Sequence, residues 1–332
     1  MIRDRLGRPL DTLRISLTDR CNFRCAYCMP ASGGPYHFLR RAELLTDAEF
    51  VRLTRVLVGL GVRKIRLTGG EPLLRPEVAE IVAGLAALDG VHDLAMTTNG
   101  YLLARKARAL KDAGLDRVNV SLDSLDNATF RQLNGNRSDV SQVLAGLSAA
   151  REAGLAPIKV NAVVKRGVND DGILELAAFC REQGYTLRFI EFMDAGSSNG
   201  WRYEHVVTAE EIIARIADWQ PLEPLDHAPD SVSLMYRYQD GRGAVGVIAS
   251  VSRPFCRGCS RLRLSAEGKL YTCLFGVDGL DLRTPLRAGA SDAEISAMIA
   301  ALWQRRADRY SELRASASAD TPRRVEMYHI GG

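Results

Sequence analysis

Six cysteines are the residues of this 332-residue chain with the clearest capacity for chemistry, and they form two groups of three. The first group has the spacing C-x3-C-x2-C, and the second has C-x2-C-x13-C. Three thiolates on one compact loop can bind three irons of a four-iron cluster and leave the fourth iron open for another ligand. The groups are Cys21, Cys25 and Cys28 near the start, and Cys256, Cys259 and Cys273 near the end.

A zinc site is the alternative for each group, because structural zinc usually has four protein ligands. Beside the first group, the nearest further candidate is His37, which adjoins a glycine-rich stretch, and an iron–sulfur cluster is therefore favoured. The second group leaves zinc open, since His329 or an acidic residue could complete its ligand set. The seventh cysteine, Cys180, lies in an apolar helical pattern and is expected to be a buried core thiol.

Six short β-like runs, each followed by a helical pattern, must position the first cysteine group. Strands that alternate with helices indicate α/β architecture, with βα units around a parallel sheet. Six units are fewer than the eight of a closed barrel, so we expect an incomplete (βα)6 TIM-like barrel, with a doubly wound sheet as the alternative. The runs begin at Leu13, Lys64, Asp93, Arg117, Ile158 and Thr186.

The pattern changes after the sixth run. Residues 194–206 are small and polar and predict a loop, and a helix is expected at 209–216. Strand-like runs with turn signals follow, and then a long helical stretch at 292–313. We therefore predict a partial barrel at 1–200 and a smaller C-terminal α+β domain at 201–332 that closes the open side.

Polar and small residues gather where the predicted strands end. They are TGGE at 68–71, TTN at 97–99, SLD at 121–123 and EFM at 191–193. The carboxyl ends of parallel strands form the edge at which α/β proteins bind ligands. These four segments are therefore expected to share one site.

The overall composition excludes several classes of protein. A balance of 44 basic and 40 acidic residues is too mild to predict a nucleic-acid partner. No run of about 18 uncharged apolar residues predicts a membrane span. The N-terminus has no apolar signal region, so a cytoplasmic location is expected, and seven cysteines in such a chain argue against a disulfide framework.

The first cysteine motif, together with TGGEP at 68–72 and the aromatic Tyr27, resembles the radical S-adenosylmethionine (SAM) superfamily. This resemblance implies a [4Fe–4S] cluster that binds SAM through its open iron. It also implies one-electron cleavage of SAM to a 5′-deoxyadenosyl radical, which takes a hydrogen atom from the substrate. Glycine is expected in the TGGEP segment because its backbone approaches the cofactor closely.

The order of motifs along the whole chain narrows the resemblance to the GTP 3′,8-cyclases of molybdenum cofactor biosynthesis. Shared blocks include SLTDRCNFRCAYCMP, IRLTGGEPLLR, VNVSLDSL, IKVNAVVKRGVND, FCRGCSRLRL and the terminal Gly-Gly. The family resemblance implies a second [4Fe–4S] cluster whose open iron coordinates guanine. It also implies abstraction of the ribose C3′ hydrogen of GTP, attack of that carbon on guanine C8, and formation of 3′,8-cyclo-7,8-dihydro-GTP.

The resemblance also implies roles for individual residues. Arginine forks suit phosphate oxygens, and a triphosphate needs several of them. We expect the basic members to converge on the edge that bears the first cysteine group. The residues expected to bind GTP are Arg14, Arg66, Thr97, Lys159, Arg261, Leu262 and Arg263, and those expected to contact SAM are Tyr27, Gly70, Ser121 and Met193.

The C-terminal Gly331-Gly332 is expected to enter the active site and help activate the substrate. Two residues without side chains can pass through a narrow cavity, and the preceding VEMYHI is apolar enough to dock. The resemblance further implies a homodimer, a flavodoxin or ferredoxin as electron donor, and cyclic pyranopterin monophosphate synthase as the next enzyme. Two rival functions are a radical SAM maturase that acts on a peptide and a zinc-binding interaction protein without catalysis.

Overall fold

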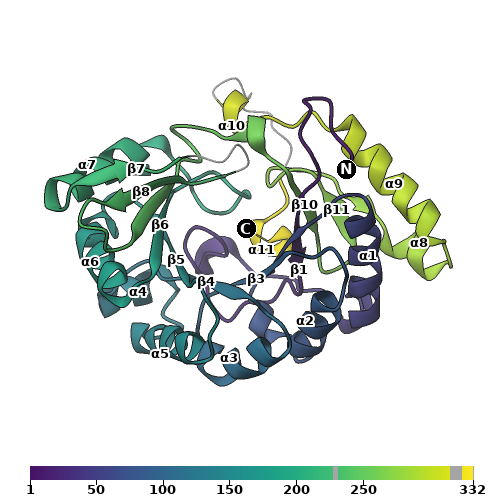
Figure 1. Ribbon diagram of the computed structural model, residues 1–332, viewed down its shortest axis with the longest axis horizontal. Helices are drawn as coiled ribbons and strands as arrows, with labels where there is room; N and C mark the ends of the chain where they lie inside the picture. Colours follow the sequence, from purple (N-terminus) through teal and green to yellow (C-terminus); the bar gives the residue numbers. More distant parts are fainter. Residues whose placement is uncertain (227–230, 315–323, 332) are drawn as a thin grey trace.

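The computed structural model describes residues 1–226, 231–314 and 324–331. In this part of the chain, 12 strands form one curved sheet in the order β12-β11-β10-β1-β2-β3-β4-β5-β6-β9-β8-β7. Helices cover the outer face of the sheet, and the C-terminal helix lies inside its curve (Figure 1). The sheet therefore has a concave inner face that is open to ligands.

The six predicted βα strands are confirmed, and neighbouring members run parallel. Their outward-facing residues are apolar; Leu13 and Ile15, for example, are fully buried. Most of the alternate positions carry charged or polar residues, because successive side chains of a strand point to opposite faces. The strands are β1 Thr12–Ser16, β2 Lys64–Thr68, β3 Asp93–Thr98, β4 Arg117–Ser121, β5 Lys159–Val164 and β6 Thr186–Glu191.

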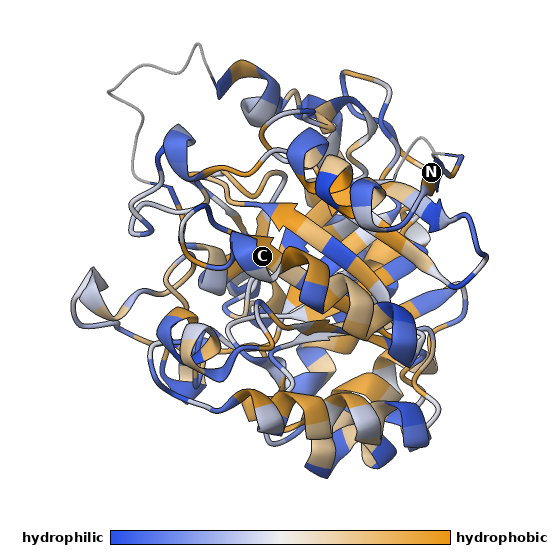
Figure 2. Cartoon of the chain, turned by 90° about the vertical axis from the view of Figure 1, so that its left-hand side faces the viewer, coloured by the Kyte–Doolittle hydropathy of each residue, from blue (hydrophilic) through white to orange (hydrophobic). Residues whose placement is uncertain are grey.

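Amphipathic helices connect these strands and bury their apolar faces on the outside of the sheet (Figure 2). Local signals set several of the helix ends. Helix α1 begins with a capping box between Thr46 and Glu49, and α6 ends at Gly184 with φ of 72°. The helices are α1 Asp47–Gly59, α2 Val78–Ala86, α3 Leu103–Asp112, α4 Asn127–Leu133, α5 Val140–Glu152 and α6 Ile173–Gln183.

The C-terminal part of the chain extends both edges of the same sheet. Strand β10 pairs in parallel with β1, and β9 pairs in parallel with β6, while the outer strands are antiparallel. The α/β class and the incomplete barrel are thus confirmed. The domain boundary near residue 200 stays a prediction. Strands β9 and β10, which come after that residue, pair with β6 and β1, which come before it. The added strands are β7 Leu222–Pro224, β8 Leu234–Tyr238, β9 Ala244–Ile248, β10 Arg261–Leu264, β11 Lys269–Tyr271 and β12 Leu280–Asp281.

The expected long helix at 292–313 is wrong, because it is interrupted. Helix α9 ends at Arg305, and the next residue, Arg306, leaves the helical region and turns its buried guanidinium inward. The remaining C-terminal helices are α7 Ala209–Trp219, α8 Arg283–Arg287, α9 Asp292–Arg305, α10 Tyr310–Leu313 and α11 Met327–Ile330. Within the described residues, no helix has the length and apolar character needed to cross a membrane.

Candidate active site

The inner face of the sheet carries a row of basic side chains. Arg14 of β1 lies opposite Arg66 of β2 on one side and Arg263 of β10 on the other. Two further basic residues were not predicted: Arg117 and Arg188 share the inward-facing positions of β4 and β6. We call this set the inner wall, and its members are Arg14, Arg66, Arg117, Lys159, Arg188, Arg261 and Arg263.

The two cysteine groups lie at opposite ends of this wall. The loop with Cys21, Cys25 and Cys28 follows the carboxyl end of β1. Strand β10 runs parallel to β1, so Cys259, which precedes β10, lies at the amino end. Cys273 follows β11, which runs antiparallel to β10, and therefore returns to that same end.

This arrangement corrects one expectation about the basic residues and shows where Leu262 lies. The basic residues do not converge on the edge that bears the first cysteine group, because their strand positions place them between the two ends. Leu262 buries its side chain fully in the core between Arg261 and Arg263, and its expected contact with GTP stays a prediction. Its side chain faces away from the inner wall because neighbours on a strand alternate.

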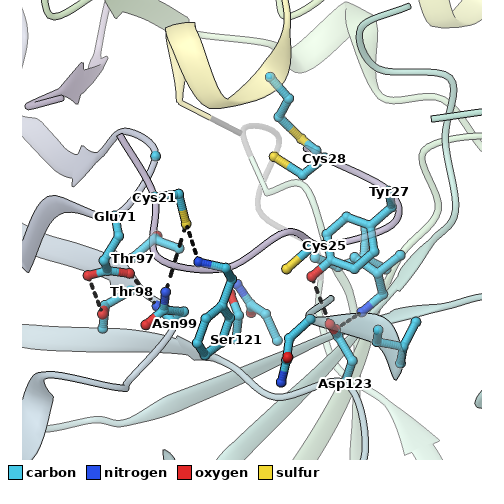
Figure 3. A pocket seen from close by; sticks show the side chains of 18 of the residues that line it. Cys21, Cys25, Tyr27, Cys28, Glu71, Thr97, Thr98, Asn99, Ser121 and Asp123 are labelled. Atoms are coloured by element: carbon cyan, nitrogen blue, oxygen red, sulfur yellow. Dashed lines mark hydrogen bonds between the residues drawn. The ribbon is translucent and has the colours of Figure 1, made fainter. Parts of the chain in front are cut away.

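The first cysteine group borders a cavity of about 180 Å³ at the carboxyl end of the sheet (Figure 3). All four predicted SAM contacts line this cavity together with the three cysteines. Burial, followed by the charge of Glu71, raises the pKa of the Cys21 thiol to about 12. Burial also raises the pKa of Cys25 and Cys28, so a cation is needed to hold these sulfurs as thiolates.

Two buried carboxyl groups shape this cavity, and the sequence had not assigned a role to either. Asp123 accepts a 2.7 Å hydrogen bond from the Tyr27 hydroxyl and a 2.9 Å bond from the Val163 amide. Glu71 accepts bonds from the Thr98 hydroxyl and the Asn99 amide, both at 2.7 Å. Burial raises the pKa of Glu71 to about 7 and that of Asp123 to about 6. The signal in the sequence that could have identified both residues is a carboxyl side chain shortly after the end of a predicted strand.

The glycine pair before Glu71 joins β2 to the cysteine loop. The Gly70 amide donates 2.7 Å to the Thr18 carbonyl, and the Glu71 amide donates 2.8 Å to the Arg20 carbonyl. A Cβ on Gly70 would lie 2.2 Å from the Arg20 carbonyl oxygen. The glycine is therefore required for contact between two backbones, which fixes the start of the first cysteine loop.

Two arginines surround Cys259 in the second cysteine group. Arg261 Nε donates to Cys259 Sγ at 3.4 Å, and Arg306 Nη2 donates to the same sulfur at 3.1 Å. Burial opposes ionisation of Cys259, but the charges of Arg261 and Arg306 outweigh it and lower the pKa of the thiol to about 6. This sulfur is thus held as a thiolate near neutral pH.

A buried ionic network anchors the same end of the barrel. Asp4 pairs with Arg8 at 2.6 Å and with Arg306 at 3.2 Å. Arg8 also donates 2.8 Å to the Cys256 carbonyl, and Arg306 donates 2.7 Å to the Cys259 carbonyl. Sequence reasoning missed this network, because Arg8 and Cys256 are 248 positions apart in the chain and Asp4 and Arg306 are 302 apart.

The inner wall concentrates positive charge on side chains that are buried or half-buried. Burial, then repulsion from Arg188, Arg117 and Arg66, lowers the pKa of Lys159 to about 8. Burial, reinforced by neighbouring cations, also lowers the pKa of Arg188 and of Arg263 to about 10. Buried cations are costly unless an anion accompanies them. The wall therefore has the electrostatics of a site for a polyanion.

The C-terminal tail ends against this wall. The Gly331 carbonyl accepts a hydrogen bond from Arg263 Nη1, and Gly331 is buried with φ of 71°. A Cβ on Gly331 would lie 2.2 Å from Cγ2 of Thr68. The predicted entry of the tail into the barrel is thus seen for Gly331, whereas Gly332 lies outside the described residues.

Comparisons with known proteins agree with this geometry. A family model described as "Radical SAM superfamily" matches residues 15–180, and one described as "Molybdenum Cofactor Synthesis C" matches residues 185–312. A GTP 3′,8-cyclase of Acidothermus cellulolyticus is 54% identical over 100% of this chain and 99% of its own length. The corresponding protein of Aquifex aeolicus is 46% identical over the full length of both chains.

The chain belongs to the GTP 3′,8-cyclase family. It is a radical SAM enzyme of molybdenum cofactor biosynthesis. The crystal structure of Streptococcus suis SuiB bound to S-adenosylmethionine shares the fold, with a TM-score of 0.62, 15% identity, and coverage of 87% of this chain and 68% of that chain. A second SuiB structure contains a precursor peptide, but at 14% identity it shows the fold alone. The peptide-maturase and zinc-protein alternatives are therefore set aside.

The donor sets fit the [4Fe–4S] clusters of this family. Each thiolate of such a cluster binds a different iron, so the sulfurs surround a cube instead of meeting at one point. Among the described residues, no three His, Cys, Asp or Glu side chains converge as a single metal ion requires. His329, once considered for zinc, lies 3.2 Å from Glu267 instead.

Proposed function

We propose that the chain converts GTP into 3′,8-cyclo-7,8-dihydro-GTP while holding the nucleotide between the two cysteine groups. The observation that carries this proposal is the inner wall, a set of buried and half-buried cations that lies between the two groups. A nucleoside triphosphate provides both parts that this geometry requires: a polyanion for the wall and a base that can reach one end.

The two cysteine groups are assigned different tasks. Cys21, Cys25 and Cys28 hold the cluster beside the cavity lined by Tyr27 and Met193. When bound there, the cluster and SAM supply a 5′-deoxyadenosyl radical. The group of Cys256, Cys259 and Cys273 holds the second cluster, which we assign to the guanine ring.

Residues of the chain itself position the substrate. Arg14, Arg66 and Arg263 occupy one register across three adjacent strands, so their guanidinium groups can share one triphosphate. Asp93 on β3 pairs with Arg66 and also with Arg117 at 2.8 Å, and so orients both guanidinium groups. The carbonyl of Gly331 orients Arg263 in the same way. We assign the tail this orienting role in substrate activation.

The cavity beside the first cysteine group excludes water from the place where the radical would form. Tyr27 is tied to Asp123, and Phe23, Phe130 and Leu133 add apolar lining. A dry lining protects a reactive carbon radical from side reactions. The other expectations stay predictions: a flavodoxin or ferredoxin donor, a homodimer, a cytoplasmic location and transfer of product to cyclic pyranopterin monophosphate synthase.

The test is anaerobic reconstitution with iron and sulfide, followed by incubation with SAM, dithionite and each nucleoside triphosphate in turn. Cyclised product is expected from GTP alone, because guanine provides both the carbon that is attacked and the group that binds the second cluster. Equal conversion of ATP or CTP would contradict the proposal. Metal analysis of the same sample should give about eight irons per chain, four for each cluster.

A further inference from the structure

The loop that follows β6, predicted from its small and polar residues, had no assigned role. Its first residue, Asp194, comes directly after the cavity residue Met193. The Asp194 carboxylate accepts from the Tyr310 hydroxyl at 2.5 Å, from Arg314 Nε at 2.9 Å and from Arg324 Nη1 at 3.0 Å. Burial opposes its ionisation, but these partners outweigh burial and keep the pKa of Asp194 below its usual value.

A second carboxylate makes the reciprocal contact from the tail to the loop. Glu326 accepts from the Ser197 amide at 3.1 Å and from the Ser198 hydroxyl at 3.0 Å. A Cβ on Gly196 would lie 2.3 Å from the Glu326 carboxylate, so a larger residue there would displace it. The loop and the tail thus each contribute a carboxylate that the other binds.

The same tail residues meet the loop of the second cysteine group. The Val325 amide donates 3.2 Å to the Gly276 carbonyl, three residues beyond Cys273. Arg324 lies over the rings of Tyr310 and Phe275, at 4.2 Å and 5.5 Å from their centroids. This end of the tail is therefore fixed by charge, by backbone hydrogen bonding and by aromatic stacking.

Beyond this anchor, the tail passes the first cysteine group before it reaches the inner wall. Burial raises the pKa of Cys28, and a hydrogen bond from the Tyr328 backbone N–H to its sulfur works in the opposite direction. The Tyr328 ring meets Tyr36 edge-on at 5.6 Å. Gly331 follows three residues later, on Arg263. Figure 1 shows this helical segment, α11, at the centre of the barrel.

We infer that Asp194 is a positioning residue: with Glu326 it forms a clasp that holds residues 324–331 in the barrel, and so sets Gly331 against Arg263 and Tyr328 against Cys28. The clasp links the loop after β6, which follows the cavity residue Met193, to the inner wall. The inference rests on the proposed role of the inner wall in binding GTP only for its catalytic consequence. Docking of the tail itself is independent of that role.

The experiment compares Asp194→Asn with Arg324→Gln and with the double variant, and Glu326→Gln provides a second route if Asp194→Asn fails to fold. Hydrogen–deuterium exchange of the reconstituted enzyme without substrate reports docking directly. The amides of 325–331 should exchange about tenfold faster or more in each variant, the factor that corresponds to the loss of one charge-assisted hydrogen bond. Amides of the six parallel strands should keep their wild-type protection.

Two further measurements distinguish positioning from general destabilisation. The EPR spectrum of the reduced first cluster should shift, because the Tyr328 N–H leaves a ligand sulfur. The turnover number for cyclised product should fall while iron content and GTP affinity stay at wild-type values. Asp292→Asn, which breaks a surface pair with Arg52, is the matched control and should change none of these.

The loss in the double variant should be smaller than the sum of the two single losses, since both single variants remove the contact between Asp194 and Arg324. Unchanged exchange of 325–331 in Asp194→Asn would overturn the clasp, and so would additive losses. If exchange rises as expected but product formation stays normal, the clasp exists and the proposed role of the tail in catalysis is wrong. Amide exchange therefore tests the clasp, and product formation tests the role of the tail in catalysis.

Discussion

Lys159 gives a pH-dependent test of the inner wall. Its pKa lies at about 8 instead of the ordinary 10.5, because it is buried and three arginines repel its proton. A bound triphosphate would stabilise the charged ammonium and raise that pKa again. Binding above pH 8 must therefore take up a proton, and affinity for GTP must fall as the pH rises.

The size of the effect follows from the fraction of Lys159 that is charged in the free enzyme. Nearly all of it is charged at pH 7, and about a tenth remains charged at pH 9, so affinity for GTP should fall about tenfold over that range. In Lys159→Arg the charge persists, because arginine stays protonated, and the decline should be absent. In Lys159→Met, affinity should already be low at pH 7 and should not change further through this site.

The assay is anaerobic titration calorimetry with GTP at pH 7, 8 and 9 in buffers that differ in ionisation enthalpy, which counts the protons taken up. The ratio of wild-type to Lys159→Arg affinity removes the ionisation of GTP itself. Lys106→Arg, on the outer helix α3, is the control and should follow the wild type. A pH-independent ratio would refute the assignment of Lys159 to the triphosphate.

Four further outcomes are expected. Cys25→Ala should abolish 5′-deoxyadenosine, measured by chromatography, because the first cluster loses an iron ligand; retained SAM cleavage would contradict this. Cys273→Ala should lose cyclised product but keep some uncoupled SAM cleavage, and normal GTP turnover would show that the second group does not hold the substrate. Arg14→Ala should weaken GTP binding about tenfold or more and guanosine binding much less, because the lost fork faces phosphate. Gly331→Ala should keep both clusters but lose product, since its Cβ meets Thr68 at a left-handed φ; wild-type product yield would mean that the tail end is not needed.

Local patterns in the sequence predicted the six βα strands and the kind of cofactor well. Each βα strand was visible as a short run of β-favouring residues, and period-two alternation already paired Arg261 with Arg263 on one face. The spacing of cysteines within each loop is also local. Such features require no knowledge of which strands become neighbours.

What the sequence could not give was the relation between distant segments. The second cysteine group lies at the amino end of the sheet only because β10 joins β1 in parallel, and nothing near Cys259 indicates that pairing. The buried contact of Asp4 with Arg306 and the path of the tail past Cys28 likewise join segments that are far apart in the chain. Arg117 and Arg188 require no knowledge of distant segments. Each occurs in a correctly predicted strand, where the alternation of side chains would have placed it on the inner face with the other basic residues.

The most direct test of the central claim uses GTP with deuterium at ribose C3′. The reconstituted enzyme is incubated anaerobically with this substrate, SAM and dithionite, and the 5′-deoxyadenosine is analysed by mass spectrometry. If GTP lies between the two cysteine groups with its ribose facing the SAM cavity, 5′-deoxyadenosine should acquire the deuterium and cyclised product should accumulate. If 5′-deoxyadenosine forms without deuterium, and labelled and unlabelled GTP are consumed at the same rate, the abstracted hydrogen does not come from ribose C3′. The proposed placement of the nucleotide is then wrong.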